Sequence, residues 1–363
     1  MADLPAAPAP RRLMPATVLD EAEYKRRFLS AYPDPAFDPL RDELARLADA
    51  AWSAYSAHRK SPRTRKAGEG FADPDYDLAV DWLEAHEAIR AAQAAYDEPS
   101  RPSRVLIVNG SSRSEHTCPG ESSKSWRLIE IAQAVFAREP TIATEILDLS
   151  RLTSEYGRHI HPCKGCFSTA AALCHWPCSC YPNYSLGQTQ DWMNEIYPMW
   201  VAADAVLIVS PVYWLQAPSP LKLMIDRMVC ADGGNPDPTS THGKRPQEAK
   251  ALELAGWSYP RHLAGRLFGL VVHGDAEGLD ATREALTRWL TSMQLTPAGE
   301  AALLGRYIGY YGPYATSHEA LDQDEAVQEE TRNAARALIE AVHAKGAGPA
   351  RRAGEGLKDP RPK

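Results

Sequence analysis

A turn rich in glycine, serine and arginine follows the first predicted strand and suits a phosphate group. The turn reads Asn109-Gly110-Ser111-Ser112-Arg113, and a predicted helix begins near Ser123 after the loop Ser114–Glu121. A helix N-terminus presents unsatisfied N–H groups and the positive end of the helix dipole, to which serine hydroxyls and basic side chains add donors and charge. The serines suit a purely structural role as helix N-caps equally well. The residues expected at a phosphate are Ser111, Arg113, Ser123, Lys124 and Ser125.

Two common nucleotide-binding patterns do not fit this turn. The chain contains no G-x-x-x-x-G-K-[ST] sequence, and Gly110 is not followed by the G-x-G-x-x-G spacing of a dinucleotide site. The turn therefore indicates a cofactor that ends in a phosphate but is not a dinucleotide.

An aromatic loop follows another predicted strand. The run Ala205–Ser210 is almost wholly apolar, as in a strand covered on both faces. Pro211, Val212, Tyr213 and Trp214 come next, at the carboxyl end of that strand, where open α/β sheets bind their ligands. The loop can offer a planar stacking surface and free backbone N–H groups, although the two aromatic residues could instead be core residues of an ordinary strand-to-helix unit.

The segment His161–Pro182 is dense in cysteine and could bind a metal. It holds five of the seven cysteines of the chain, namely Cys163, Cys166, Cys174, Cys178 and Cys180. Four thiolates suffice for an iron–sulfur cluster or a tetrahedral zinc, and nearby histidines could replace one of them. The same cysteines could also be metal-free thiols or a redox disulfide, so the three interpretations stay open.

The composition is that of an ordinary globular protein. Of 363 residues, 44% are hydrophobic and 24% are charged, and the net charge of −7 gives no support for a nucleic-acid binder. No stretch approaches the about 18 to 20 apolar residues of a membrane span, and the first residues lack the apolar core of a signal peptide. We therefore expect a soluble, cytoplasmic protein without nucleic-acid or membrane partners, whose cysteines serve metal or redox chemistry.

Strands and helices alternate from Arg104 onward. Right-handed crossovers between parallel strands place helices on both faces of a sheet, so the pattern predicts an α/β fold with a five-stranded, parallel, doubly wound sheet. The expected strands are Val105–Asn109, Ile142–Leu149, Ala205–Ser210, Leu267–His273 and Ala301–Tyr307. The expected helices are Ser123–Arg138, Thr189–Ala202, Ser219–Cys230, Leu279–Gln294 and Glu325–His343.

The segments around this region differ in composition and suggest three parts. Residues 1–103 are expected to hold a disordered start and a helical extension, with helices over 40–58 and 75–96 and a basic, solvated linker between them. Residues 104–343 form the expected α/β domain, and residues 344–363 an expected disordered tail. Within the domain, the polar loop Ala231–Pro260 is too rich in proline and glycine to be core and is expected to be a lid or an interface element.

Together the motifs resemble the flavodoxin-like NAD(P)H-dependent FMN reductase family over about residues 104–343. The family's G-S-x-R turn corresponds to Gly110–Arg113, its P-x-Y loop to Pro211–Tyr213, and its helix end L-K-x-x-I-D-R to Leu221–Arg227. The resemblance implies non-covalent FMN, with the phosphate at the first turn and helix start and the isoalloxazine ring against residues 211–214. This chain departs from the family in its longer phosphate loop and in its first hundred residues.

A third loop of the family corresponds to the residues after the fourth strand. The resemblance implies cofactor contacts from His273, Gly274 and Asp275. His273 could polarise the flavin or donate to it, although a lone histidine there is more often a structural hydrogen-bonding residue. A tyrosine cluster at residues 307, 310, 311 and 314 could cover the flavin or a partner's pocket, or form a packed turn.

The cysteine segment is similar to that of the iron–sulfur flavoproteins, relatives of the same family. In those proteins a compact cysteine motif holds a cubane cluster beside the flavin. The spacing differs here, because the first pair is C-x-x-C, the next cysteine lies eight positions on, and the last two are separated by one residue.

The resemblance implies an FMN-dependent NAD(P)H oxidoreductase that passes electrons to a small acceptor such as a quinone or a flavin. The flavin carries the chemistry, so no catalytic acid or base is predicted. One alternative is an iron–sulfur flavoprotein that carries electrons, and another is a non-enzymatic binding module with the same fold. The resemblance to these flavodoxin-like reductases also implies that the protein forms a homodimer or homotetramer.

Overall fold

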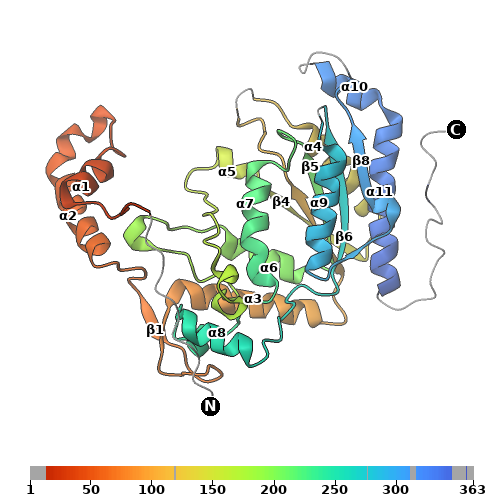
Figure 1. Cartoon of the computed structure of the whole chain (residues 1–363). Coiled ribbons are helices and arrows are strands. Elements are labelled where there is room, and N and C mark those ends of the chain that lie inside the picture. The colour runs from red at the N-terminus through yellow and green to blue at the C-terminus, as the bar shows by residue number, and fades with distance from the viewer. Residues whose placement is uncertain (1–13, 118–119, 276, 311–315, 346–356, 358–363) are drawn as a thin grey trace.

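A parallel β-sheet forms the centre of the molecule (Figure 1). The computed structural model describes residues 14–117, 120–275, 277–310, 316–345 and 357. The strand order is β4-β3-β5-β6, and β6 continues the sheet by pairing with β7 at its start and with β8 further along. The strands are β3 (Ser103–Asn109), β4 (Ile142–Asp148), β5 (Ala205–Pro211), β6 (Leu267–Gly274), β7 (Thr296–Pro297) and β8 (Leu303–Tyr307).

Every pairing in this sheet is parallel, which confirms the predicted doubly wound α/β fold. Each long strand was predicted within two residues at either end because continuous apolar, β-branched runs are typical of strands buried on both faces. The two-residue strand β7 was not predicted. It pairs only with Leu267 and Phe268.

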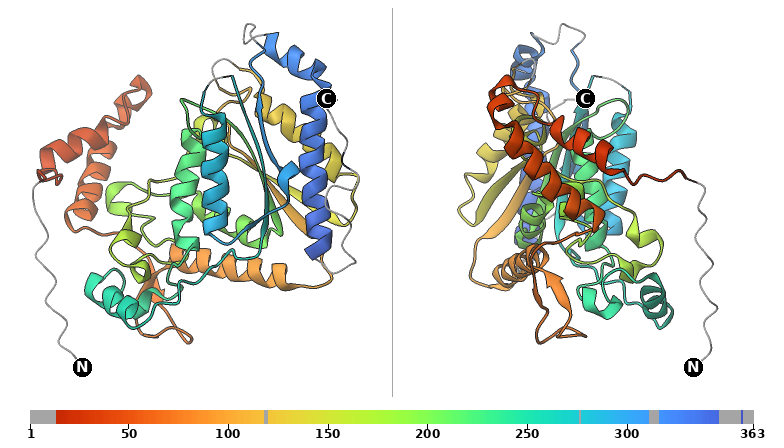
Figure 2. Two further views of the ribbon diagram at one scale, coloured as in Figure 1. Left: turned by 45° about the vertical axis from the view of Figure 1, so that its right-hand side comes forward. Right: turned by 90° about the vertical axis from the view of Figure 1, so that its left-hand side faces the viewer.

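Helices cover both faces of the sheet (Figures 1 and 2). One core lies between the sheet and helices α4 (Lys124–Phe136) and α11 (Glu325–Lys345). The other lies between the sheet and helices α6 (Met193–Ala202), α7 (Ser219–Arg227) and α9 (Leu279–Ser292). Side chains of β3 alternate between the two cores, as the pleat of a strand requires. The same region also contains the short helices α5 (Arg151–Ser154) and α10 (Ser317–Gln323).

The N-terminal region contains the two predicted helices, α2 (Arg41–Ser56) and α3 (Val80–Asp97), together with helix α1 (Glu21–Leu29) and a hairpin that were not predicted. Helices α1 and α2 stand away from the sheet, at the left of Figure 1. Strands β1 (Thr64–Lys66) and β2 (Asp77–Ala79) pair antiparallel, so part of the expected linker is a strand. Helix α3 packs on α6 and begins later than predicted because β2 occupies the residues before it.

The polar loop at residues 231–260 is more ordered than its composition predicts. It contains helix α8 (Pro246–Leu254), and Asn235, Thr239 and Thr241 are buried within it. Burial is tolerated because the polar groups are paired. The Asn235 amide donates to the Ala172 carbonyl (3.2 Å), for example. The expectation that this segment is too polar for the interior was wrong at these positions.

In the part of the chain that the structure describes, no helix combines the length and the apolar character needed to cross a membrane.

Candidate functional site

A cavity of about 240 Å³ lies at the carboxyl ends of β3, β5 and β6. This is the edge where open α/β sheets bind ligands. All of the residues predicted to bind the cofactor, except Trp214, line it together with Ile308. The lining residues are Ser111, Arg113, Ser123, Lys124, Ser125, Pro211, Val212, Tyr213, His273, Gly274, Asp275 and Ile308.

The turn after β3 is fixed by its own hydrogen bonds. The Asn109 side chain donates to Asp148 Oδ1 (2.7 Å) and accepts the N–H of Ser111 (3.1 Å). The Ser111 hydroxyl oxygen in turn accepts the N–H of Arg113 (3.1 Å). A Cβ atom at Gly110 would lie 2.9 Å from Ser210 Oγ, so any larger residue there would require the Ser210 side chain to shift. Asn109 and Asp148, whose hydrogen bonds position the turn, were not among the predicted site residues.

The N-terminus of α4 brings positive charge to the same cavity. Ser123 caps the helix, because its Oγ accepts the N–H of Trp126 (3.1 Å), as the structural interpretation of the serines predicts. Lys124 and Ser125 form the buried first turn. Burial lowers the pKa of Lys124, the carboxylate of Asp275 opposes this, and the guanidinium of Arg113 lowers it further. The helix end and the two cations therefore make this side of the cavity suitable for an anion.

His273 lines the cavity as a buried, neutral ring. Its Nε2 lies 2.8 Å from the Ser125 hydroxyl. Burial, and secondarily the nearby charge of Lys124, lower its pKa from 6.5 to about 3. An uncharged imidazole paired with a serine is what a structural, hydrogen-bonding histidine would show.

Replacing His273 by glutamine is expected to reduce the loss of stability at acid pH. The unfolded histidine binds a proton below pH 6.5 and the folded one only near pH 3, so the free energy of unfolding falls as the pH drops through that window. The slope reaches about 1.4 kcal/mol per pH unit. Urea unfolding across this range measures it. The exposed His116→Gln serves as the control, and parallel curves for His273→Gln and the unaltered protein would contradict the assignment.

The loop after β5 is tied to the loop after β6. The Val212 N–H donates to the His273 carbonyl (2.8 Å), and Tyr213 and Gln216 exchange two backbone hydrogen bonds (2.8 and 3.0 Å). Trp214 and Leu215 at the tip have positive φ angles of 47° and 69°. This tight turn directs Trp214 outward, where it is 95% exposed. Trp214 therefore does not line this cavity, and its expected contact with the flavin ring stays a prediction.

Ile308 is the one lining residue that sequence reasoning missed. It follows β8, and its N–H donates to the Gly274 carbonyl (2.9 Å). The only feature of the sequence that could have pointed to Ile308 as a cavity residue is its apolar side chain, and it lies in a segment that stood out for its tyrosines instead. In that segment the Tyr310 hydroxyl donates to Asp324 (3.2 Å), whereas Tyr311 and Tyr314 lie outside the described residues.

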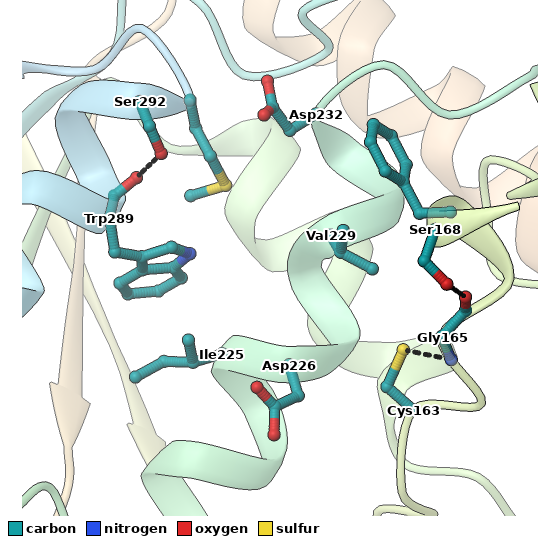
Figure 3. A pocket seen from close by; sticks show the side chains of 11 residues that line it. Cys163, Gly165, Ser168, Ile225, Asp226, Val229, Asp232, Trp289 and Ser292 are labelled. Carbon is teal, nitrogen blue, oxygen red and sulfur yellow. Dashed lines mark hydrogen bonds between the residues drawn. The ribbon is translucent and has the colours of Figure 1, made fainter. Parts of the chain in front are cut away.

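The cysteine segment brings two thiols into contact. Cys166 Sγ and Cys180 Sγ are 3.2 Å apart, and Lys244 Nζ lies 3.6 Å from Cys166 Sγ. Cys174 and Cys178 are buried nearby. Cys163 faces elsewhere, because it accepts the Gly165 N–H (3.4 Å) and lines a separate cavity of about 560 Å³ beside α7 and α9 (Figure 3).

The metal interpretation of these cysteines is not supported. Among residues 14–117, 120–275, 277–310 and 316–345, no group of three or more His, Cys, Asp or Glu side chains is arranged to hold a metal ion. None of these cysteines lines the predicted cofactor cavity. Cys174 and Cys178 pack near Cys230, beyond the last turn of α7, while the cavity borders the loop before its first turn. The nine residues of α7 span roughly 13 Å.

Comparison with known proteins identifies the family. The family described as NADPH-dependent FMN reductase matches residues 103–307, and no curated protein matches the chain. One similar solved structure is RosB with the bound intermediate 8-demethyl-8-formylriboflavin-5'-phosphate (14% identity, 67% of this chain, 79% of that chain, TM-score 0.44). A second is a flavone reductase (16% identity, 66% of this chain, 65% of that chain, TM-score 0.36). A third is an azoreductase from Bacillus anthracis str. Sterne (12% identity, 65% of this chain, 99% of that chain, TM-score 0.34). Because the family match spans more than half of the sequence, the chain belongs to the NADPH-dependent FMN reductase family.

Proposed function

We propose that this protein is an FMN-dependent NAD(P)H oxidoreductase that binds FMN in the cavity at the carboxyl ends of β3, β5 and β6. The observation that carries the proposal is the meeting of the α4 N-terminus, Arg113 and Lys124 with the Pro211–Tyr213 loop in that one cavity. One side of it can hold a phosphate and the other a flat ring, in a member of a family of FMN reductases.

The phosphate side is built for an anion before any ligand enters. The hydrogen bonds from Asn109 through Ser111 to Arg113 fix the backbone of the turn. The first helical N–H groups of α4 point out of the helix end, as the geometry of any α-helix requires. A phosphate there would meet charge-assisted hydrogen bonds from Arg113 and Lys124, which are stronger than neutral ones.

The ring side is formed by Pro211, Val212, Tyr213 and Gly274. A Cβ atom at Gly274 would lie 3.2 Å from Val212 Cβ, so glycine keeps the two loops close. Bound FMN would supply the hydride-accepting ring. The chain itself would hold the phosphate, orient the ring and leave one face open to the nicotinamide, which requires no catalytic acid or base.

The acceptor we propose is a small molecule such as a quinone, a free flavin or an azo compound. Family membership supports flavin-dependent reduction in general. We further propose a cytoplasmic homodimer or homotetramer as the working form. The visible spectrum of anaerobically purified protein, recorded before and after addition of NADPH, tests the reductase. Flavin bands that bleach would support it, whereas protein that cannot take up FMN would favour a binding module.

Tyr213→Ala is expected to weaken FMN binding by about tenfold, because stacking of an aromatic ring contributes roughly 1 kcal/mol beyond its buried area. Trp214→Ala in the same loop should change the Kd by less than about twofold, since its side chain is 95% exposed. Quenching of FMN fluorescence on binding measures both. A larger effect at Trp214 than at Tyr213 would place the ring against the outer face of the loop instead.

A further inference from the structure

Cys166 and Cys180 form a thiol pair that the proposed flavin chemistry does not use. Their sulfur atoms are 3.2 Å apart, although 14 positions separate the residues in the chain. A disulfide bond of about 2.05 Å would need the sulfur atoms to approach by roughly 1.2 Å. Neither cysteine lines the cofactor cavity, and the neighbouring Cys174 and Cys178 pack near Cys230, which follows the end of α7.

The two thiols differ in their access to solvent. Cys166 is partly exposed, whereas Cys180 is buried at 7% exposure. Cys178 and Cys174 are buried as well. A small oxidant from solution therefore reaches Cys166 first, with Cys180 behind it in bonding range.

Two lysines place positive charge beside the pair. Lys244 Nζ lies 3.6 Å from Cys166 Sγ and is held there by donating to the Leu173 carbonyl (2.9 Å). The Lys60 ammonium donates to the Ser179 carbonyl, next to Cys180. Such cations stabilise a thiolate, which is the reactive form of cysteine.

The charge distribution selects Cys166 among its neighbours. The hydrogen bond from Cys180, together with Lys244, lowers the pKa of Cys166 to about 6. Burial raises the pKa of Cys174 and of Cys230, so both stay protonated at neutral pH.

We propose that Cys166 and Cys180 are a peroxide-reactive dithiol that closes reversibly to a disulfide. The Cys166 thiolate attacks one oxygen of hydrogen peroxide, the O–O bond breaks, and with one proton the products are a sulfenic acid on Cys166 and water. The Cys180 thiol then displaces the hydroxyl group from that sulfur, forming the S–S bond and a second water. Two thiols thus lose two electrons and two protons to one peroxide, and a small dithiol reverses the oxidation.

This inference is independent of the proposed function. It needs neither bound FMN nor NAD(P)H, and it names a modification site that does not line the cofactor cavity. Failure to bind FMN would contradict the proposed reductase function but not the dithiol proposal. Failure to form the disulfide would contradict the dithiol proposal but not the reductase function.

The test treats reduced full-length protein with one equivalent of hydrogen peroxide, alkylates the remaining thiols and maps the peptides by mass spectrometry. The expected product joins residues 166 and 180 and disappears on addition of dithiothreitol. In the Cys180→Ser variant the sulfenic acid on Cys166 should instead be trapped by dimedone. Cys163→Ser is the matched control in the same loop, because Cys163 is also partly exposed but bonds to a backbone N–H, and it should still form the bond.

The role of the lysine is measured as a rate. At about pH 5, below the Cys166 pKa of about 6, Lys244→Met should slow oxidation of Cys166 by about tenfold, because there a rise of one unit in the thiol pKa removes about nine-tenths of the thiolate. Lys250→Met, at an exposed lysine paired with Glu253, should leave the rate unchanged. Far-ultraviolet circular dichroism of each variant checks that the fold is kept.

Several results would overturn the proposal. A disulfide joining residues 163 and 166, or faster oxidation of Cys163 than of Cys166, would show that the reactive pair is not Cys166 and Cys180. Reduced, native protein in which Cys166 resists peroxide would remove the reactive thiol. Stoichiometric iron or zinc in purified protein, bound so that these thiols resist alkylation, would replace the dithiol by a metal site.

Discussion

Changing Ser111 and Arg113 together to alanine is expected to weaken FMN binding by about a hundredfold. A charge-assisted hydrogen bond contributes about 1.5 to 3 kcal/mol and a neutral one about 1 kcal/mol, and each 1.4 kcal/mol is a factor of ten in Kd. The effects of the single changes should not add, because the Ser111 hydroxyl oxygen also accepts the N–H of Arg113 and shapes the turn.

Comparison with riboflavin separates the phosphate from the rest of the cofactor. The unaltered protein should bind FMN more tightly than riboflavin, which lacks the phosphate, and the double variant should lose most of that preference. Arg288→Ala, at an exposed arginine on α9, is the matched control and should bind both as before. An unchanged ratio of the two Kd values in the double variant would mean that the phosphate lies elsewhere.

Asp191→Ala is expected to destabilise the fold by about 3 to 5 kcal/mol, because it leaves a buried guanidinium without its counter-charge. Asp191 Oδ2 accepts a hydrogen bond from Arg227 Nη2 (2.6 Å), and both side chains are 0% exposed. Arg227 also donates to the His161 carbonyl (2.9 Å) and lies over the ring of Tyr181. The pair joins the end of α7 to the cysteine segment, so its loss should loosen both.

The neighbouring pair on α7 provides the comparison. Lys222 and Asp226 form an exposed ion pair four residues apart, so Asp226→Ala should cost no more than about 0.5 kcal/mol. Urea unfolding at neutral pH measures both variants against the unaltered protein. Equal, small losses for Asp191→Ala and Asp226→Ala would show that water or another group replaces the buried carboxylate.

Elements with a strong pattern could be predicted from the sequence, and elements defined by tertiary contacts could not. The long parallel strands are continuous apolar runs, which fixes both their type and their approximate ends. Strand β7 has only Thr296 and Pro297, and the hairpin strand β1 is the basic sequence Thr64–Lys66. Neither strand has a repeating pattern of apolar residues, so each is a strand only because its backbone pairs with a neighbouring strand.

The cofactor cavity was largely predictable because its residues follow strands that end at one edge of the sheet. The positions of individual side chains were less so. The direction of Trp214 depends on two consecutive positive φ angles at residues that are not glycine, which composition does not reveal. The contribution of Ile308 depends on a backbone bond to Gly274. Cysteine spacing likewise does not determine which thiols face one another, and here Cys163 faces away from Cys166 and Cys180.

The coupling of the two ring-side loops limits how this scaffold can be redesigned for other acceptors. Val212 is bonded to the His273 carbonyl, and a Cβ atom at Gly278 would lie 2.7 Å from Leu215 Cα. A loop grafted between Pro211 and Ala217 would therefore contact the residues at the start of α9. Exchange of this loop alone would disrupt its packing against the loop after β6. Engineering of acceptor range has to transplant both loops as one cassette and keep glycine at position 278.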